Sequence, residues 1–364
     1  MGGEDYGGQL ICDLQFLQHW NNIGVKVDAY ILGDGPAVEK YVKFFDNYKI
    51  IPPLKAEFGG GFKAILKGIK NSKAYVTVNK HQTTLENEYD AILYQSQGYV
   101  FLAAYFAKKY RTKAYWYMPN SINRFFGKLY YNIVLRLKNI TPVANSIYTM
   151  KSLGKICKYY IYPGYDVNRV KLSSHSNFRT NLNIGDNEII FGTAARITPM
   201  KAQDLLIEAF VKSDILRATK AHLLIAGIPE DQNFYETCLR IAENDLDRIH
   251  FLENVDDMKS FYNTIDIYVN SRRDAEPFGI SIAESLGAGL PVISNSLGGP
   301  SEMITDQING WLVRSPNSRS YKKTMELAIS NKENWPEMSI TNRKRAELFT
   351  SNRGAELFLE ILIP

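Results

Sequence analysis

The sequence predicts an α/β protein with two Rossmann-like, doubly wound parallel sheets, and three observations support this prediction. The chain has 364 residues, more than a single hydrophobic core usually serves, so two domains are expected. Hydrophobic residues make up 45% of it and charged residues 22%, an ordinary globular balance. From about Ile184 onward, short apolar or β-branched runs alternate with helical stretches, which is the pattern of parallel βαβ units.

Five strands and their helices are predicted in the C-terminal half. Residues 203–212 place Leu206, Ala209 and Phe210 on one face of a helix, and right-handed crossovers through such helices give a doubly wound sheet. The predicted strands are residues 188–193, 221–226, 249–252, 265–270 and 291–295.

The N-terminal half repeats the alternation less regularly. Its predicted helices are residues 9–23 and 98–110, and its predicted strands are residues 25–32, 91–95 and 113–118. We expect an N-terminal domain over 1–165, a linker over 166–183, a C-terminal domain over 184–339, and a last helical stretch over 340–364 that crosses back to the N-terminal domain. A Rossmann-like domain normally begins with an apolar strand, and none precedes the helix here, so the first strand is expected to be missing.

Cysteine, histidine and hydropathy patterns argue against a disulfide-linked, metal-binding, membrane-spanning or secreted protein. The three cysteines are widely separated and are expected to be reduced, and the five histidines form no ligand pattern, so no metal site is expected. No run of 18 apolar residues and no signal-peptide layout occurs, which predicts a cytoplasmic protein.

Positive charge is concentrated in the N-terminal half. Residues 1–165 hold 21 Lys and Arg against 11 Asp and Glu, or +10, and the rest holds 22 against 27, or −5. Residues 62–73 form a basic amphipathic segment, and residues 108–113 add further cations. An anionic acceptor or an anionic membrane surface would suit this charge, whereas no nucleic-acid motif accompanies it. A solvated basic face without function is the alternative.

Two cations follow the first strand of the C-terminal half. Arg196 and Lys201 stand between that strand and the helix beginning near Gln203. A strand's carboxyl end beside a helix amino terminus suits a diphosphate, and such cations could stabilise a leaving group as its negative charge develops. The alternative is that both side chains are merely solvated.

Two carboxylates follow the fourth strand. Glu276 lies in the loop and Glu284 at the start of the next helix, with seven residues between them, and they could grip two sets of hydroxyls along an extended ligand. The alternative is a stabilising carboxylate cap at a helix amino terminus. Gly298 and Gly299 form a further glycine turn before another helix.

Together these motifs resemble those of the retaining glycosyltransferases of family 4, the glycosyl transferases of group 1. The resemblance covers about residues 145–313 and also includes Asn145-Ser146, residues 162–166 and residues 309–313 in the same order. It implies a GT-B fold, in which two Rossmann-like domains face each other across a cleft, with acceptor binding in the N-terminal domain and nucleotide-sugar binding in the C-terminal one.

The resemblance also implies a role for each site residue. Arg196 and Lys201 would hold the donor diphosphate, Glu276 the hydroxyls of the transferred sugar, and Glu284 the ribose. Further donor contacts are implied for two glycines, two residues after the third strand and two backbone amides: Gly7, Gly8, Asn254, Val255, Phe278 and Gly279. The resemblance implies no metal, no other cofactor and no protein general base.

The implied function is transfer of a hexose or deoxyhexose from a nucleotide diphosphate sugar to a saccharide or lipid-linked saccharide, in surface polysaccharide or glycolipid synthesis. Many relatives carry a histidine for the sugar 6-hydroxyl where this chain reads WYMPNS, so either Asn120 substitutes or the donor is a 6-deoxy sugar. A catalytically impaired nucleotide-sugar-binding protein is the alternative. A dinucleotide-dependent oxidoreductase is disfavoured because no GxGxxG opens a helix.

Overall fold

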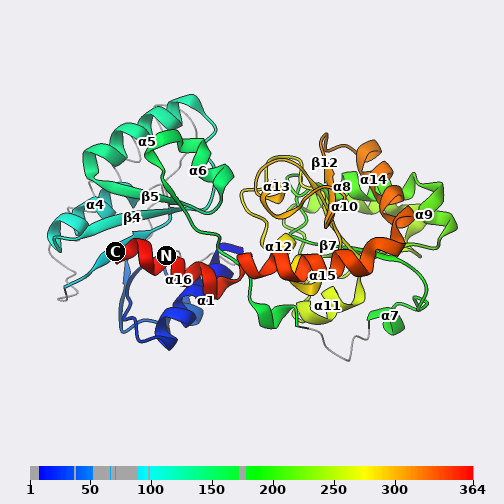
Figure 1. Ribbon diagram of the computed structural model, residues 1–364, viewed down its shortest axis with the longest axis horizontal. Helices are drawn as coiled ribbons and strands as arrows, with labels where there is room; N and C mark the ends of the chain where they lie inside the picture. Colours follow the sequence, from blue (N-terminus) through cyan, green and yellow to red (C-terminus); the bar gives the residue numbers. More distant parts are fainter. Residues whose placement is uncertain are drawn as a thin grey trace. The chain divides into compact units, whose positions relative to one another are not determined.

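The computed structural model describes residues 8–36, 38–51, 66, 70, 88–96, 99–171 and 178–363. The chain divides into two compact units, an N-terminal unit of Met1–Gly164 with Ser351–Pro364, and a C-terminal unit of Tyr165–Thr350 (Figure 1). Every described pair of neighbouring strands is parallel. The predicted α/β class with parallel sheets is therefore confirmed.

The C-terminal unit holds a six-stranded sheet in the order β12-β11-β10-β7-β8-β9. Because β7 pairs with both β8 and β10, the direction in which strands are added reverses between β7 and β10. In open α/β sheets, ligands bind at the carboxyl ends of the strands beside such a reversal. The strands are β7 (Ile190–Ala194), β8 (His222–Ala226), β9 (Ile249–Phe251), β10 (Ile267–Asn270), β11 (Val292–Asn295) and β12 (Gly310–Val313).

Helices cover both faces of this sheet. Leu223, Leu224 and Ile225 are consecutive and all fully buried, which requires a covering layer on each side because successive strand residues point to opposite faces. The predicted helix over 203–212 is α8, and the five predicted strands are found within two residues of their ends; β12 was not predicted. The helices are α7 (Phe178–Asn181), α8 (Gln203–Val211), α9 (Asp214–Ala218), α10 (Gln232–Ala242), α11 (Met258–Thr264), α12 (Ile280–Ala288), α13 (Pro300–Met303), α14 (Ser318–Ser330) and α15 (Trp335–Ala346).

The N-terminal unit contains a four-stranded sheet, β3-β4-β5-β6, and a separate pair, β1-β2. Along β4, Tyr115 and Tyr117 pack in one core cluster and Trp116 in another, as the two-residue period of a strand requires. In the described part of this unit, the first element is helix α1. The strands are β1 (Asp28–Leu32), β2 (Asn47–Ile51), β3 (Ala91–Tyr94), β4 (Lys113–Met118), β5 (Ile140–Ala144) and β6 (Tyr159–Tyr160), and the helices are α1 (Gly8–Asn22), α2 (Val38–Val42), α4 (Val100–Lys109), α5 (Phe125–Lys138), α6 (Ile147–Leu153) and α16 (Ser351–Leu362).

The last helical stretch consists of two helices rather than one. The amide side chain of Asn342 in α15 donates to the carbonyl of Leu290 at 2.8 Å, whereas the indole of Trp20 in α1 donates to the carbonyl of Ala355 in α16 at 3.0 Å. The helical stretch is thus interrupted where its packing partners change from the C-terminal unit to the N-terminal unit. Thr350, between α15 and α16, has an extended backbone. In the part of the chain that the structure describes, no helix combines the length and apolar composition needed to cross a bilayer.

Candidate functional site

The loops that follow β7 and β10 meet beside the reversal point of the sheet. The Ser271 hydroxyl donates to the Lys201 carbonyl at 2.9 Å, and the Arg273 amide donates to the Met200 carbonyl at 3.1 Å. These bonds join two segments about 70 residues apart in the sequence. The loops therefore form one continuous surface at the carboxyl edge of the sheet.

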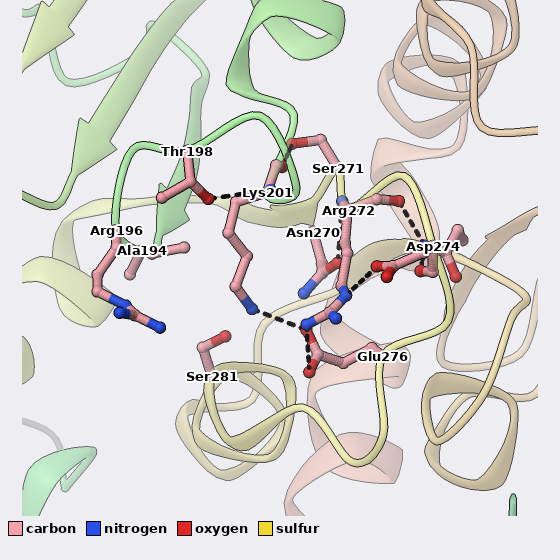
Figure 2. A network of polar contacts seen from close by, with 12 residues as sticks. Ala194, Arg196, Thr198, Lys201, Asn270, Ser271, Arg272, Asp274, Glu276 and Ser281 are labelled. Carbon is pink, nitrogen blue, oxygen red and sulfur yellow. Dashed lines mark hydrogen bonds and ion pairs between the residues drawn. The ribbon is translucent and has the colours of Figure 1, made fainter. Parts of the chain in front are cut away.

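A tight turn positions Lys201. Its amide donates to the Thr198 carbonyl at 3.0 Å, and the next residue, Ala202, adopts a left-handed conformation (φ 58°) as the N-cap of α8. The side chain then extends toward the opposite loop, where its Nζ lies 2.9 Å from Oε2 of Glu276 (Figure 2). The structure thus brings together two residues that the sequence indicated separately.

Glu276 is held between two cations. Oε1 of its carboxylate lies 3.2 Å from Nη1 of Arg272, while Lys201 occupies Oε2, and only 10% of the side chain is exposed. Burial alone would raise the pKa of Glu276, but the charges of Lys201 and Arg272 outweigh burial, and the pKa lies below its usual value. Glu276 is therefore an anion at neutral pH.

Arg272 is a site residue that the sequence reasoning missed. Its Nε donates to Asp274, and its Nη1 contacts Glu276, so both acids fix the guanidinium (Figure 2). The neighbouring Arg273 turns away and pairs with Asp204. The available signal was the spacing of Arg272 four residues before Glu276 in a loop that follows a buried strand.

The glycine turn after β11 holds the backbone of Glu276. The Glu276 amide donates to the Leu297 carbonyl at 3.2 Å, and the Gly299 amide donates to the Glu276 carbonyl at 2.8 Å. At Gly298, which has a φ of 89°, a Cβ would lie 2.2 Å from the Glu276 carbonyl oxygen. Only glycine permits this approach, so the turn acts as a backbone support for the carboxylate loop.

Arg196 stands apart from this network. Its side chain is 60% exposed, and its Nη1 lies 2.5 Å from Glu230 (Figure 2 shows Arg196 separate from Glu276). The structure therefore places Arg196 at the same sheet edge as Lys201 but pairs it with a different acid.

Glu284 lies inside α12 and not at its amino terminus, so the alternative of a helix cap is wrong for this residue. Its side chain is 6% exposed, with Oε1 2.8 Å from Nε of Arg169 and Oε2 accepting the Tyr262 hydroxyl at 2.7 Å. Burial, followed by the charge of Glu284, raises the pKa of Tyr262 well above its usual value, so Tyr262 stays a hydrogen-bond donor. Arg169 and Tyr262 were not predicted.

Phe278 and Gly279, which lead into α12, are held in place by packing. Phe278 is 3% exposed, and Gly279 is the left-handed N-cap of α12 with a φ of 99°. A Cβ on Gly279 would lie 2.9 Å from the Ile282 side chain. This packing fixes the backbone between Glu276 and α12.

The remaining predicted residues are separate from this loop pair. Asn254 and Val255 follow β9 at the same sheet edge, and Asn254 is exposed and donates to Asp256 at 2.8 Å. Gly8 begins α1 in the N-terminal unit, and Gly7 lies outside the described residues.

The arrangement suits an anionic ligand that also carries hydroxyls. Lys201 and Arg272 supply positive charge at the carboxyl edge of the sheet, and Glu276 supplies an ionised acceptor between them. A second buried carboxylate, Glu284, follows on the adjacent helix. Within the described residues, no three His, Cys, Asp or Glu side chains are grouped as metal ligands.

Part of the chain is similar in sequence to known glycosyltransferases. Residues 174–345 match the family model described as glycosyl transferases group 1. An Escherichia coli O-antigen biosynthesis glycosyltransferase, WclY, is 27% identical over 58% of this chain and 56% of its own length. A Salmonella typhimurium lipopolysaccharide 1,2-N-acetylglucosaminetransferase is 26% identical over 47% of each chain. The matches thus span about half the length of these curated relatives.

Solved structures resemble the whole chain. Anabaena HepE, in complex with UDP and glucose, superposes with a TM-score of 0.78 at 18% identity, over 100% of this chain and 97% of that one. A Rickettsia africae glycosyltransferase superposes with a TM-score of 0.80 at 18% identity, over 100% and 96%. The predicted resemblance to group 1 glycosyltransferases and the predicted GT-B fold are both confirmed.

Proposed function

We propose that this chain is a retaining, metal-independent glycosyltransferase that moves a hexose or deoxyhexose from a nucleotide diphosphate sugar to a saccharide or lipid-linked saccharide. The observation that carries the proposal is the buried Glu276 held between Lys201 and Arg272 at the reversal point of the sheet. Similarity to HepE in complex with UDP and glucose supports a nucleotide-sugar donor.

Lys201 would bind the donor diphosphate, together with Arg196 after it leaves Glu230. As the bond from the sugar C1 to the diphosphate breaks, both bonding electrons leave with the diphosphate, and fixed cations stabilise that charge. Arg196 is exposed enough to turn toward a phosphate, and arginine can hold two phosphate oxygens at once.

Glu276 would accept hydrogen bonds from hydroxyls of the transferred sugar, assisted by the backbone amides of Phe278 and Gly279. The acceptor oxygen would attack C1 on the face that the diphosphate leaves, which retains the configuration. The departing diphosphate oxygen would take the acceptor's proton, so no protein base is assigned.

Glu284 would bind the ribose hydroxyls, and the base would lie against Asn254 and Val255 beyond β9. Gly7 and Gly8 would bring backbone amides to the phosphates. A carboxylate has about four lone-pair sites, so Glu284 can accept from a ribose while it retains Arg169 and Tyr262.

The acceptor is proposed to belong to surface polysaccharide or glycolipid synthesis. The names of the E. coli and S. typhimurium relatives support this, since they refer to O-antigen and lipopolysaccharide. Because the N-terminal half is basic, we also propose that the protein lies in the cytoplasm at the inner face of an anionic membrane. Of the basic segments predicted to dock there, 62–73 falls mostly outside the described residues, and Lys108, Lys109, Arg111 and Lys113 are exposed.

A thermal-shift screen with UDP, GDP, dTDP and ADP, with and without EDTA, tests the donor site. A ligand bound by the folded state alone raises the melting temperature. We expect one diphosphate to stabilise the wild type, with EDTA having no effect, and Lys201→Ala to show a smaller shift. Lys212→Ala, which removes an exposed lysine paired with Glu208, is the matched control. No shift with any nucleotide would overturn the proposal; a shift without sugar transfer would favour the impaired binding protein.

A further inference from the structure

Helix α5 is apolar on its exposed side as well as on its buried side. Tyr131, Val134 and Leu135 pack into the core of the N-terminal unit. On the other side, four large apolar side chains are exposed by 73%, 73%, 50% and 50%, and we call them the α5 apolar face: Phe125, Phe126, Leu129 and Ile133. Lys128 and Asn132 lie beside this face, so it is an exposed apolar surface with a polar border, which is typical of a surface that binds a partner or a membrane.

The four side chains form one stripe. Phe125, Leu129 and Ile133 follow one another at a spacing of four, which places them on one side of the helix. The rings of Phe125 and Phe126 contact each other with centroids 5.7 Å apart. The stripe is therefore a contiguous surface and not a scatter of single exposed residues.

Positive charge continues this stripe at the carboxyl end of α5. Arg136 is exposed and stands three residues after Ile133, so it lies on the same side of the helix. It lines a shallow hollow with Asn139 and Lys158. A second hollow that shares Asn139 is lined by Arg111 and Lys113 together with one acid, Asp90. Cations from the segments that lead into β4, β5 and β6 thus lie at this edge of the four-stranded sheet.

The sequence that follows Asp90 carries no negative charge as far as residue 165. Residues 91–165 contain 11 Lys and Arg and no Asp or Glu, a net charge of +11, whereas the remaining residues contain 32 against 38, or −6. A second copy of this chain would present the same positive charge to the α5 apolar face, and the two copies would repel each other. An anionic surface with an apolar interior complements both features.

We propose that the α5 apolar face docks the N-terminal unit on a bilayer containing anionic lipid. The phenylalanine rings would enter the boundary between headgroups and acyl chains, and Arg136 with the cations of the adjoining edge would contact lipid phosphates. The inference rests on the proposed membrane partner and names the surface that would contact it.

Vesicle co-sedimentation of the purified full chain tests the docking surface. We expect binding to phosphatidylcholine vesicles that contain phosphatidylglycerol, and little to phosphatidylcholine alone. Phe125→Ser with Phe126→Ser should weaken binding about tenfold or more, because the inserted apolar area is lost. Arg136→Glu with Lys158→Glu should weaken it comparably and reduce its dependence on salt.

Matched controls lie in the C-terminal unit. Ile340→Ser replaces a side chain that is also 73% exposed, and Lys344→Glu reverses an exposed cation, and neither should alter binding. An unchanged melting temperature and nucleotide-diphosphate shift would show that each variant is folded. If the double serine variant binds vesicles as strongly as the wild type, the α5 apolar face is not the docking surface, although a membrane partner remains supported. A dimer that the serine variant dissolves would likewise overturn the α5 docking surface. No binding by the wild type would overturn both the surface and the membrane partner while leaving the transferase proposal intact.

Discussion

The guanidinium Nε of Arg169 lies 2.8 Å from Oε1 of Glu284, and this ion pair ties the 3₁₀ turn at Val167–Arg169 to the interior of helix α12. The Tyr262 hydroxyl holds the other carboxylate oxygen at 2.7 Å. Both oxygens of a buried acid are thereby oriented before any ligand arrives. If Glu284 binds the ribose hydroxyls, the preference of the protein for a ribonucleotide depends on Arg169 and Tyr262.

Replacement of Arg169 by Ala should lower the preference for a ribonucleotide. Without the ion pair, Glu284 can rotate, and its hydrogen bonds to two neighbouring hydroxyls lose their geometry. The test compares the affinities of UDP and 2′-deoxy-UDP, or the corresponding pair for whichever base binds. We expect the wild-type ratio to fall several-fold, with the protein destabilised by about 1–3 kcal/mol because a buried charge loses a partner. Tyr262→Phe should change the ratio less, and an unaltered ratio in both variants would exclude the positioning role.

Replacement of Lys201 by Ala should lower the rate of transfer more strongly than it weakens donor binding. The lysine would neutralise charge that grows as the diphosphate departs, so its loss should lower kcat by about 10²–10³. Lys201→Arg should restore part of the rate, since the charge returns with a different shape. Equal losses in kcat and in donor affinity would instead make Lys201 a ground-state binding residue.

Sequence reasoning located the strands and loops of this site but not their side-chain partners. The strands were predictable because buried parallel strands are apolar on both faces, and the loops followed from that. The pairing of Lys201 with Glu276 was not, because it depends on which strands are neighbours. Arg272 escaped notice since an arginine after a strand is usually solvated.

Elsewhere, tertiary contacts overrode local pattern. Strand β12 begins at Gly310, a residue type that is rare in strands, and it is defined by its pairing with β11. The break before α16 cannot be read from residues 340–362, whose pattern is helical throughout. It follows from the change of packing partner at Thr350.

Arg272 and Arg273 provide a matched pair. Arg272 holds Glu276, whereas Arg273 pairs with Asp204 and the Pro199 carbonyl. Arg272→Ala should therefore reduce kcat/KM by about tenfold or more, as loss of a charge-assisted contact does. Arg273→Ala should lower the melting temperature slightly and leave the rate near that of the wild type. The opposite ranking would remove Arg272 from the site.

Stability should fall as the pH decreases from about 7 to 5. His222 and His250 stack with Nδ1 and Nε2 3.1 Å apart, and burial lowers the pKa of both. The unfolded chain takes up protons below about pH 6.5, and the folded chain does so only at lower pH, so the free energy of unfolding decreases in this window. Melting temperatures measured from pH 8 to 5 should show this loss, and the double variant His222→Gln with His250→Gln should show a smaller one.

Glu276 affects stability in a separate pH range. Its pKa is lowered in the folded chain, so stability is lost below about pH 4 as that carboxylate becomes protonated.

Replacement of Gly298 by Ala should damage the site through the backbone. The added Cβ would lie 2.2 Å from the carbonyl oxygen of Glu276, and the residue has a φ of 89°, which alanine adopts at a cost. We expect destabilisation by about 2–4 kcal/mol and a rate that falls further than stability alone explains, because Glu276 must move. Gly185→Ala is the matched control, since its nearest neighbour would be the flexible Glu188 side chain at 3.4 Å. If Gly298→Ala is as stable and active as Gly185→Ala, the glycine turn does not support the carboxylate loop.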